Sequence, residues 1–275
     1  MKSILIATDF SQPSRNAAIY AAALAKEAGA EITLLHVYML PTPVSEVPYV
    51  MVSVDEIQAE NEKLARAFAD ELQAISGGPV KALVVIGMPA DEVVYQANEI
   101  KADLIVTGMR GATTGIDKLI GSTTAAVMRK SHLPVLVIPD GHSYSALRDI
   151  CYATDFSHSM NLACLSLLQF WMRLHPEAIL QVVHVQDTGS VMSAEQVSGK
   201  VRVAQKLMQT PHKFHVVENH SVEAGLHQFL QDNPCQLLVM VAHRHSWWER
   251  LVSGSHTREM VYRADIPLLV LQDKD

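Results

Sequence analysis

Short apolar runs alternate with longer stretches of helical periodicity through the first 140 residues of the chain. A continuous run of Val, Ile and Leu indicates a buried strand, whereas apolar residues spaced three and four apart indicate one face of a helix. Five strands are predicted in this part of the chain, at residues 2–8, 31–38, 80–86, 103–107 and 134–138. Four helices are predicted between them, at residues 13–28, 54–75, 89–100 and 122–131.

This alternation predicts an α/β domain with a parallel sheet covered by helices on both faces, because its strands are apolar throughout. The strand count favours a doubly wound order of the flavodoxin-like or a related kind. In such sheets, ligands bind beyond the carboxyl ends of the strands, at the point where the strand order reverses. We therefore expect the site residues directly after the first, second and fourth strands.

The chain repeats itself, which predicts two copies of one domain. The segment ILIATDFSQPSRNA at 4–17 matches ICYATDFSHSMNLA at 150–163, and the stretch ATDFS is identical in both. Two further pairs follow in the same order: TLLHV with QVVHV, and HLPVLVIPD with DIPLLVLQD. We therefore predict tandem doubly wound domains at 1–140 and 147–275, each with a five-stranded parallel sheet. Pairing the last strand of each copy would hide two exposed sheet edges, so the chain is expected to form an internal pseudo-dimer, with or without homodimerisation.

Composition narrows the class of protein. Apolar residues make up 49% of the chain, enough for a core in each domain, and the net charge is −7. An acidic chain without a basic stripe argues against general nucleic-acid binding. The three cysteines, Cys151, Cys164 and Cys235, form no CxxC pair, so we expect buried, inert thiols and a cytoplasmic protein. Residues 1–9 are interpreted as a strand rather than a signal peptide, and no apolar run is long enough to span a membrane.

A glycine-rich segment after the fourth strand is the clearest candidate for chemistry. Gly108 and Gly111 are followed, after nine intervening residues, by Gly121, which opens a helix with Ser122 and Thr123. Glycines allow close backbone approach, and a helix N-terminus offers unpaired N–H groups to an anion. The segment contains neither the GxxxxGK[ST] loop nor a GxGxxG after the first strand. Two interpretations stay open at this point, a phosphate site or only a turn with a helix cap.

The GxxG, nine-residue, G[ST] pattern resembles the ATP-binding signature of the universal stress proteins. The resemblance extends over nearly the whole chain, through ILIATDFS, LLHV, GMPADEVV, DLIVTG and LPVLVIP. It implies an adenine nucleotide alpha hydrolase-like fold that binds ATP, with Mg²⁺ as the expected divalent cation. In the family, glycines and hydroxyls surround the triphosphate, the aspartate after the first strand lies near the ribose and phosphates, and the residue after the second strand's histidine binds adenine through its backbone. Residue by residue, the resemblance implies a site at Asp9, Val37, Gly108, Arg110, Gly111, Gly121, Ser122 and Thr123.

The second copy departs from this pattern. It keeps Gly254 and Ser255, but the early glycines are replaced by Ala242 and by either Arg244 or His245. A side chain at these positions obstructs close approach of phosphate, so we expect weak or absent ATP binding there.

Aromatic and imidazole side chains gather around the altered loop. Trp247 and Trp248 are interpreted as packing against the first domain or a partner, or as covering the altered site. The C-terminal histidines are interpreted as exposed or hydrogen-bonding side chains, and zinc binding is the alternative, for which no third ligand stands at a diagnostic spacing; this set comprises His212, His215, His220, His243, His245 and His256. The matching His36 and His184 are interpreted as structural.

Three functions are weighed. The first is a nucleotide-dependent stress-response or signalling module with at most slow ATP hydrolysis, since the sequence assigns no catalytic residue. The second is a scaffold that binds an apolar ligand or a protein partner through the altered second domain. The third is a slow ATPase-type enzyme. The absence of a nucleophile-elbow motif from the sequence argues against it.

Overall fold

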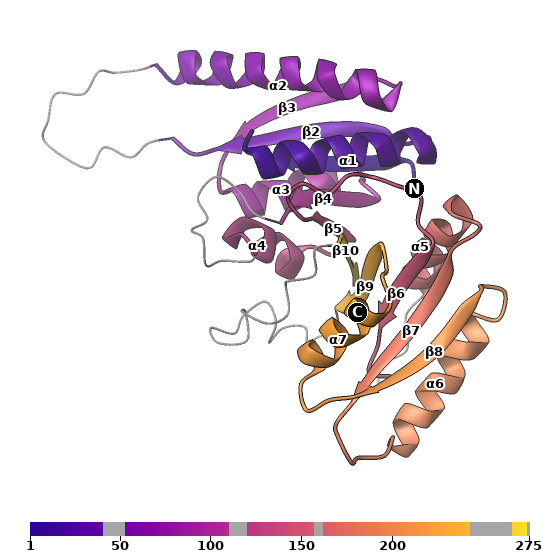
Figure 1. Ribbon diagram of the computed structural model, residues 1–275. Helices are drawn as coiled ribbons and strands as arrows, with labels where there is room; N and C mark the ends of the chain where they lie inside the picture. Colours follow the sequence, from indigo (N-terminus) through magenta and orange to yellow (C-terminus); the bar gives the residue numbers. More distant parts are fainter. Residues whose placement is uncertain (41–52, 110–119, 157–161, 243–265, 274–275) are drawn as a thin grey trace, which may run out of the picture.

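The computed structural model describes residues 1–40, 53–109, 120–156, 162–242 and 266–273. In the described part of the first half, strands and helices alternate as predicted, and every predicted bound agrees within one residue (Figure 1). The elements are β1 (Ser3–Thr8), α1 (Gln12–Ala28), β2 (Glu31–Tyr38), α2 (Val54–Ser76), β3 (Val80–Ile86), α3 (Pro89–Glu99), β4 (Leu104–Gly108), α4 (Ser122–Lys130) and β5 (Val135–Ile138).

In the described ranges, the second half repeats this order of elements up to its fourth strand and ends on a fifth strand, as the sequence repeat predicts. They are β6 (Asp149–Ala153), α5 (Leu162–Leu174), β7 (Ile179–Gln186), α6 (Ala194–Lys206), β8 (His212–Glu218), α7 (Val222–Asp232), β9 (Leu237–Ala242) and β10 (Leu268–Gln272). The helices in the described ranges are all too short or too polar to cross a membrane.

Local capping explains where the helices begin and end. The side chain of Ser11 accepts a hydrogen bond from the Ser14 amide at the start of α1, and Gly29 ends that helix with a φ of 63°. This left-handed conformation favours glycine, which has no Cβ to clash. A reciprocal capping box between Ser53 and Glu56 starts α2.

All ten described strands form one sheet in the order β3-β2-β1-β4-β5-β10-β9-β6-β7-β8. Within each half the strands are parallel, and β5 pairs with β10 in the antiparallel direction, with Leu136 opposite Leu269. The predicted pairing of the two final strands is confirmed, so the two expected five-stranded sheets join into one. A homodimer would therefore need a surface other than the β5 edge.

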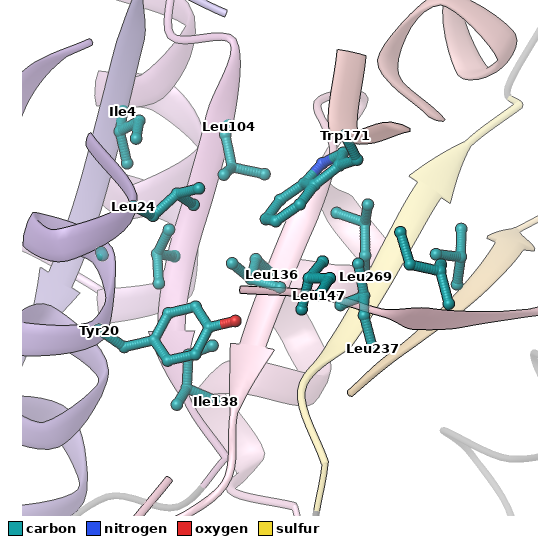
Figure 2. Packing of buried hydrophobic residues seen from close by; sticks show 14 of the residues in the cluster. Ile4, Tyr20, Leu24, Leu104, Leu136, Ile138, Leu147, Trp171, Leu237 and Leu269 are labelled. Carbon is teal, nitrogen blue, oxygen red and sulfur yellow. The ribbon is translucent and has the colours of Figure 1, made fainter. Parts of the chain in front are cut away.

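The core is divided by the two faces of this sheet rather than by the two halves. One cluster lies under α1, α2, α5 and α6, and the other lies under α3, α4 and α7; each contains residues of both halves. Figure 2 shows Trp171 of α5 near Leu136, Leu147 and Leu269, where the halves meet. Trp171 is fully buried. The two halves thus share continuous apolar packing.

The segment that connects the halves lies along α1. Asn16 donates hydrogen bonds from Nδ2 to the carbonyl oxygens of Pro139 and His142, each over 3.1 Å. Farther along the helix, the Tyr144 hydroxyl donates to Glu27 Oε2 over 2.6 Å and lies 3.5 Å from Nε2 of the buried His175. These contacts tie α1, the connecting segment and the end of α5 together.

Candidate functional site

The carboxyl ends of β1, β2 and β4 lie side by side, as expected for a ligand site. β1 pairs with β2 on one side, where Thr8 is opposite His36, and with β4 on the other. The strand order reverses between β1 and β4, because β2 and β3 lie on one side and β5 on the other. This places Asp9, Val37 and Gly108 at the edge where doubly wound sheets bind ligands.

Asp9 is exposed directly after β1. Its Oδ1 accepts hydrogen bonds from the Ser11 amide over 3.1 Å and from the Ser11 hydroxyl over 2.5 Å. Asp9 therefore makes a turn contact, and it lies beside the first turn of α1. A carboxylate is favourable there because the helix N-terminus carries partial positive charge.

The turn that carries Asp9 is held from both sides. Phe10 has a φ of 61°, a left-handed conformation that is an outlier for a bulky residue. Its amide donates to Thr8 Oγ1 over 3.0 Å, and its ring lies 4.4 Å from the ring of His36. His36 in turn donates from Nδ1 to the Thr8 carbonyl over 2.9 Å. The structural role predicted for His36 is confirmed.

The N-terminus of α4 lies next to the end of β4. The Gly121 amide donates to the Met109 carbonyl over 2.8 Å, which brings the start of α4 to the strand end. Gly121 is the N-cap in extended conformation, and no side chain caps the helix. Ser122 and Thr123 are exposed in the first turn. Among the described residues, no side chain caps these groups, so the first turn of α4 presents backbone N–H groups and two hydroxyls.

Thr124 anchors this helix start, and the sequence interpretation missed it. Its hydroxyl donates to the Gly108 carbonyl over 2.8 Å and lies 3.2 Å from Thr107 Oγ1. Both threonines are buried. The available signal was the position of Thr124 directly after Gly121, Ser122 and Thr123, which puts its side chain on the inner face of the first turn.

The remaining predicted residues are placed only in part. Val37 is half-buried near the end of β2 and packs against the cluster under α3 and α4. Arg110 and Gly111 lie outside the described residues. The nucleotide-binding roles of all eight residues stay predictions.

The register of the second half corrects one assignment. Ile4 is opposite Leu104, and its repeat counterpart Ile150 is opposite Leu237, so Leu104 corresponds to Leu237. Four residues farther along each strand, Gly108 corresponds to Val241. Ala242 therefore corresponds to Met109. The prediction that Ala242 replaces the first glycine was wrong by one position, because backbone pairing sets the register and the loop sequence alone does not show it.

Other predictions on the second half divide into those the structure reaches and those it does not. The three cysteines are buried thiols, as predicted. His184 donates from Nδ1 to the Thr154 carbonyl over 3.0 Å, which confirms its structural role. Within the described ranges, no three His, Cys, Asp or Glu side chains come together to hold a metal ion. The residues of the altered loop fall outside the described ranges: Trp247, Trp248, His243, His245, His256, Gly254 and Ser255.

Comparisons with known proteins agree with this architecture. The profile of the universal stress protein family matches residues 1–139 and 146–272. The universal stress protein Slr1230 from Synechocystis is 25% identical over 99% of this chain and all of its own length. The universal stress protein MJ0577 from Methanocaldococcus jannaschii is 31% identical over 50% of this chain and 94% of its own length.

A solved structure supports the tandem fold. The crystal structure of a universal stress protein from Archaeoglobus fulgidus matches with a TM-score of 0.75 at 20% identity, covering 99% of this chain and 98% of that one. At this identity the likeness shows the fold alone. The family assignment rests on the profile, which matches both halves separately. The chain belongs to the universal stress protein family and carries two copies of its domain in tandem.

Proposed function

We propose that the first half binds ATP, with Mg²⁺, at the carboxyl edge of β1, β2 and β4. The observation that carries the proposal is the start of α4: its N-cap is a glycine without a capping side chain, and it is held at the end of β4. Phosphate oxygens accept hydrogen bonds from such unpaired N–H groups, and the helix dipole favours their charge. The proposed site comprises Asp9, Val37, Gly108, Arg110, Gly111, Gly121, Ser122 and Thr123.

The residues at this edge fit a nucleotide with a divalent cation. The exposed hydroxyls of Ser122 and Thr123 add donors for phosphate, and the exposed carboxylate of Asp9 supplies oxygen, the ligand type that Mg²⁺ prefers. Mg²⁺ would neutralise phosphate charge that Asp9 alone would repel. The roles of the chain itself are to hold the phosphates at α4 and to orient the carboxylate through the turn after β1.

We propose that the second half lacks an equivalent ATP site. Val241 stands at the position of Gly108, and Arg244 is three residues farther, at the position of Gly111. A β-branched residue adds a side chain and restricts the backbone where the family pattern has glycine. One nucleotide per chain is the expected stoichiometry.

The biological role that follows is a nucleotide-dependent module for stress response or signalling, with at most slow hydrolysis. Two hydrogen-bond donors of Ser11 already occupy Oδ1 of Asp9. This carboxylate is therefore a poor general base, and the proposal is binding rather than dedicated catalysis. We propose the reducing cytoplasm as the location, which the three buried thiols, none of them in a disulfide, support.

Calorimetric titration of nucleotide-free protein with Mg·ATP tests this proposal. Wild type is expected to bind one ATP, Gly121→Val to abolish binding, and the matched Gly254→Val to leave it unchanged. A valine at the N-cap of α4 would cover the N–H groups of its first turn. Two sites per chain, no binding, or equal losses in both variants would overturn the asymmetric proposal.

Exposed apolar side chains at the same edge favour a second candidate function, binding of an apolar ligand or protein partner. Met39 and Met88 are 60% and 62% exposed, and Ile86 is 44% exposed. The Gly87 amide donates to the Tyr38 carbonyl over 3.0 Å, which holds the two segments together. The double variant Met39→Gln, Met88→Gln should lower binding of an apolar dye, whereas a change at Met208, which is 76% exposed on the second half, should not. Equal dye binding by the double variant and wild type would count against this function.

A further inference from the structure

The turn after β1 contains the backbone outlier Phe10, and the same outlier recurs in the second half. Phe10 has a φ of 61° and Phe156 a φ of 59°. A bulky residue in the left-handed region is strained and persists only where its surroundings hold it in place. Such strain is common at functional sites, so its contacts indicate what the turn is built to hold.

Contacts from a neighbouring strand hold the first turn. Thr8 is opposite His36 in the β1–β2 pairing, and the buried His36 donates from Nδ1 to the Thr8 carbonyl over 2.9 Å. A carbonyl only accepts, so this imidazole carries its proton on Nδ1. The Thr8 hydroxyl accepts the Phe10 amide over 3.0 Å and lies 3.0 Å from the Ser14 hydroxyl. These hydrogen bonds fix the backbone at Thr8 and at Phe10, the residues before and after Asp9, and so set the direction of the chain after β1.

The rings complete the support. The Phe10 ring lies 4.4 Å from that of His36 and 6.5 Å from that of Phe68 on α2. Arg15 lies over the opposite end of this aromatic group, 4.1 Å from the centre of the Phe68 ring. Rotation of His36 would therefore disturb both the hydrogen bond to Thr8 and the packing that keeps Phe10 left-handed.

The second half builds the same turn but covers it differently. Phe156 is fully buried, and a Cβ built on Gly199 of α6 would lie 1.8 Å from its carbonyl oxygen. Gln196 of the same helix donates to the Asp155 carbonyl over 3.4 Å. In the first half, by contrast, Phe10 is only half-buried and Asp9 is exposed. The two turns share the threonine–amide and histidine–carbonyl hydrogen bonds, since the Phe156 amide donates to Thr154 Oγ1 over 3.1 Å, and they differ in what they present to solvent.

We propose that His36 is a positioning residue for the ATP site: through Thr8 and Phe10 it fixes the Asp9 carboxylate in the orientation that meets the nucleotide and its cation. This inference rests on the proposed ATP binding by the first half. His184 makes the same contact in the second half, where the proposed function has no nucleotide, and it serves as an internal control.

The test compares substitutions at the two histidines by titration of the full chain with Mg·ATP and by thermal unfolding. Asn carries an amide nitrogen at the distance of Nδ1, so His36→Asn retains the donor, whereas His36→Leu removes it. His36→Leu should weaken ATP binding at least tenfold, and His36→Asn, which keeps the hydrogen-bond donor but loses the ring, should bind ATP more tightly than His36→Leu. His184→Leu should lower the melting temperature by as much as His36→Leu, with ATP affinity within twofold of wild type.

Each result distinguishes the inference from the proposed function. If wild type binds ATP and folded His36→Leu binds it equally well, or if His36→Asn is as weak as His36→Leu, the positioning role is overturned and the proposed function survives. If wild type binds no ATP, both are overturned. Should His36→Leu fail to fold, Thr8→Val removes the hydroxyl support of the same turn, with Thr154→Val as its match, and the same tenfold difference is expected only for Thr8→Val.

Discussion

The shared core predicts that damage at the seam between the halves destabilises the whole chain. Leu269 on β10 is fully buried and lies opposite Leu136 of the first half. Replacing it with alanine removes buried apolar surface and leaves a cavity. The surroundings cannot easily collapse into this cavity, because the sheet is packed on both faces. Large-to-small changes of this kind cost about 3–5 kcal/mol. Because the cavity borders both halves, the loss should appear in the stability of both.

Urea unfolding followed by circular dichroism and by tryptophan fluorescence measures this effect. We expect one cooperative transition for wild type and for Leu269→Ala, with both probes moving to lower urea together. Leu64→Ala is the matched control, because Leu64 is 45% exposed and surface changes stay within about 0.5 kcal/mol. The double variant with Leu136→Ala should be non-additive, since the two side chains are neighbours. Two separate transitions, with only one moved by Leu269→Ala, would refute the idea of a shared core.

Three further predictions concern the second half. Gly199→Ala should lower the free energy of unfolding by roughly 1–3 kcal/mol, because the new methyl group meets the Phe156 carbonyl. Helix propensity alone would instead raise it by about 1 kcal/mol, and such a gain, measured by urea unfolding, would contradict this contact. Burial lowers the pKa of His175, although Glu27 lies beside it. The unfolded chain binds a proton at this imidazole below about pH 6.5, whereas the native chain binds it only at a lower pH. The free energy of unfolding should therefore fall as the pH decreases through that value, and His175→Asn should flatten the fall; identical pH profiles would exclude this role. Burial raises the pKa of Cys164 to about 12, so the native chain should not react with a thiol reagent at pH 8 and should react fully in urea; rapid labelling of the native chain would show that its thiols are accessible.

The candidate site was predictable where its signals are local. The spacing of Gly108, Gly111 and Gly121 predicted a phosphate site, which stays a prediction, and Asp9 followed a strand with an apolar sequence. The inner-face position of Thr124 could be read from the sequence, but its partners Thr107 and Gly108 could not, because they become its neighbours only when α4 returns to β4. The sequence predicted Ala242 at the position of Gly108 in the second half, whereas the strand register places Val241 there. The loop sequences do not report this register.

The sequence by itself determined the elements and their order. Apolar periodicity, the Ser11 cap and Gly29 act between residues a few positions apart, so each helix and strand is readable from its own segment. Only the tertiary structure decided that Leu136 meets Leu269, that Trp171 packs at the junction of the halves, and that Phe10 is left-handed against His36. These contacts join residues far apart in the chain. Their choice depends on which apolar surfaces bury each other and which buried polar groups find partners, and both are properties of the assembled sheet rather than of any one segment.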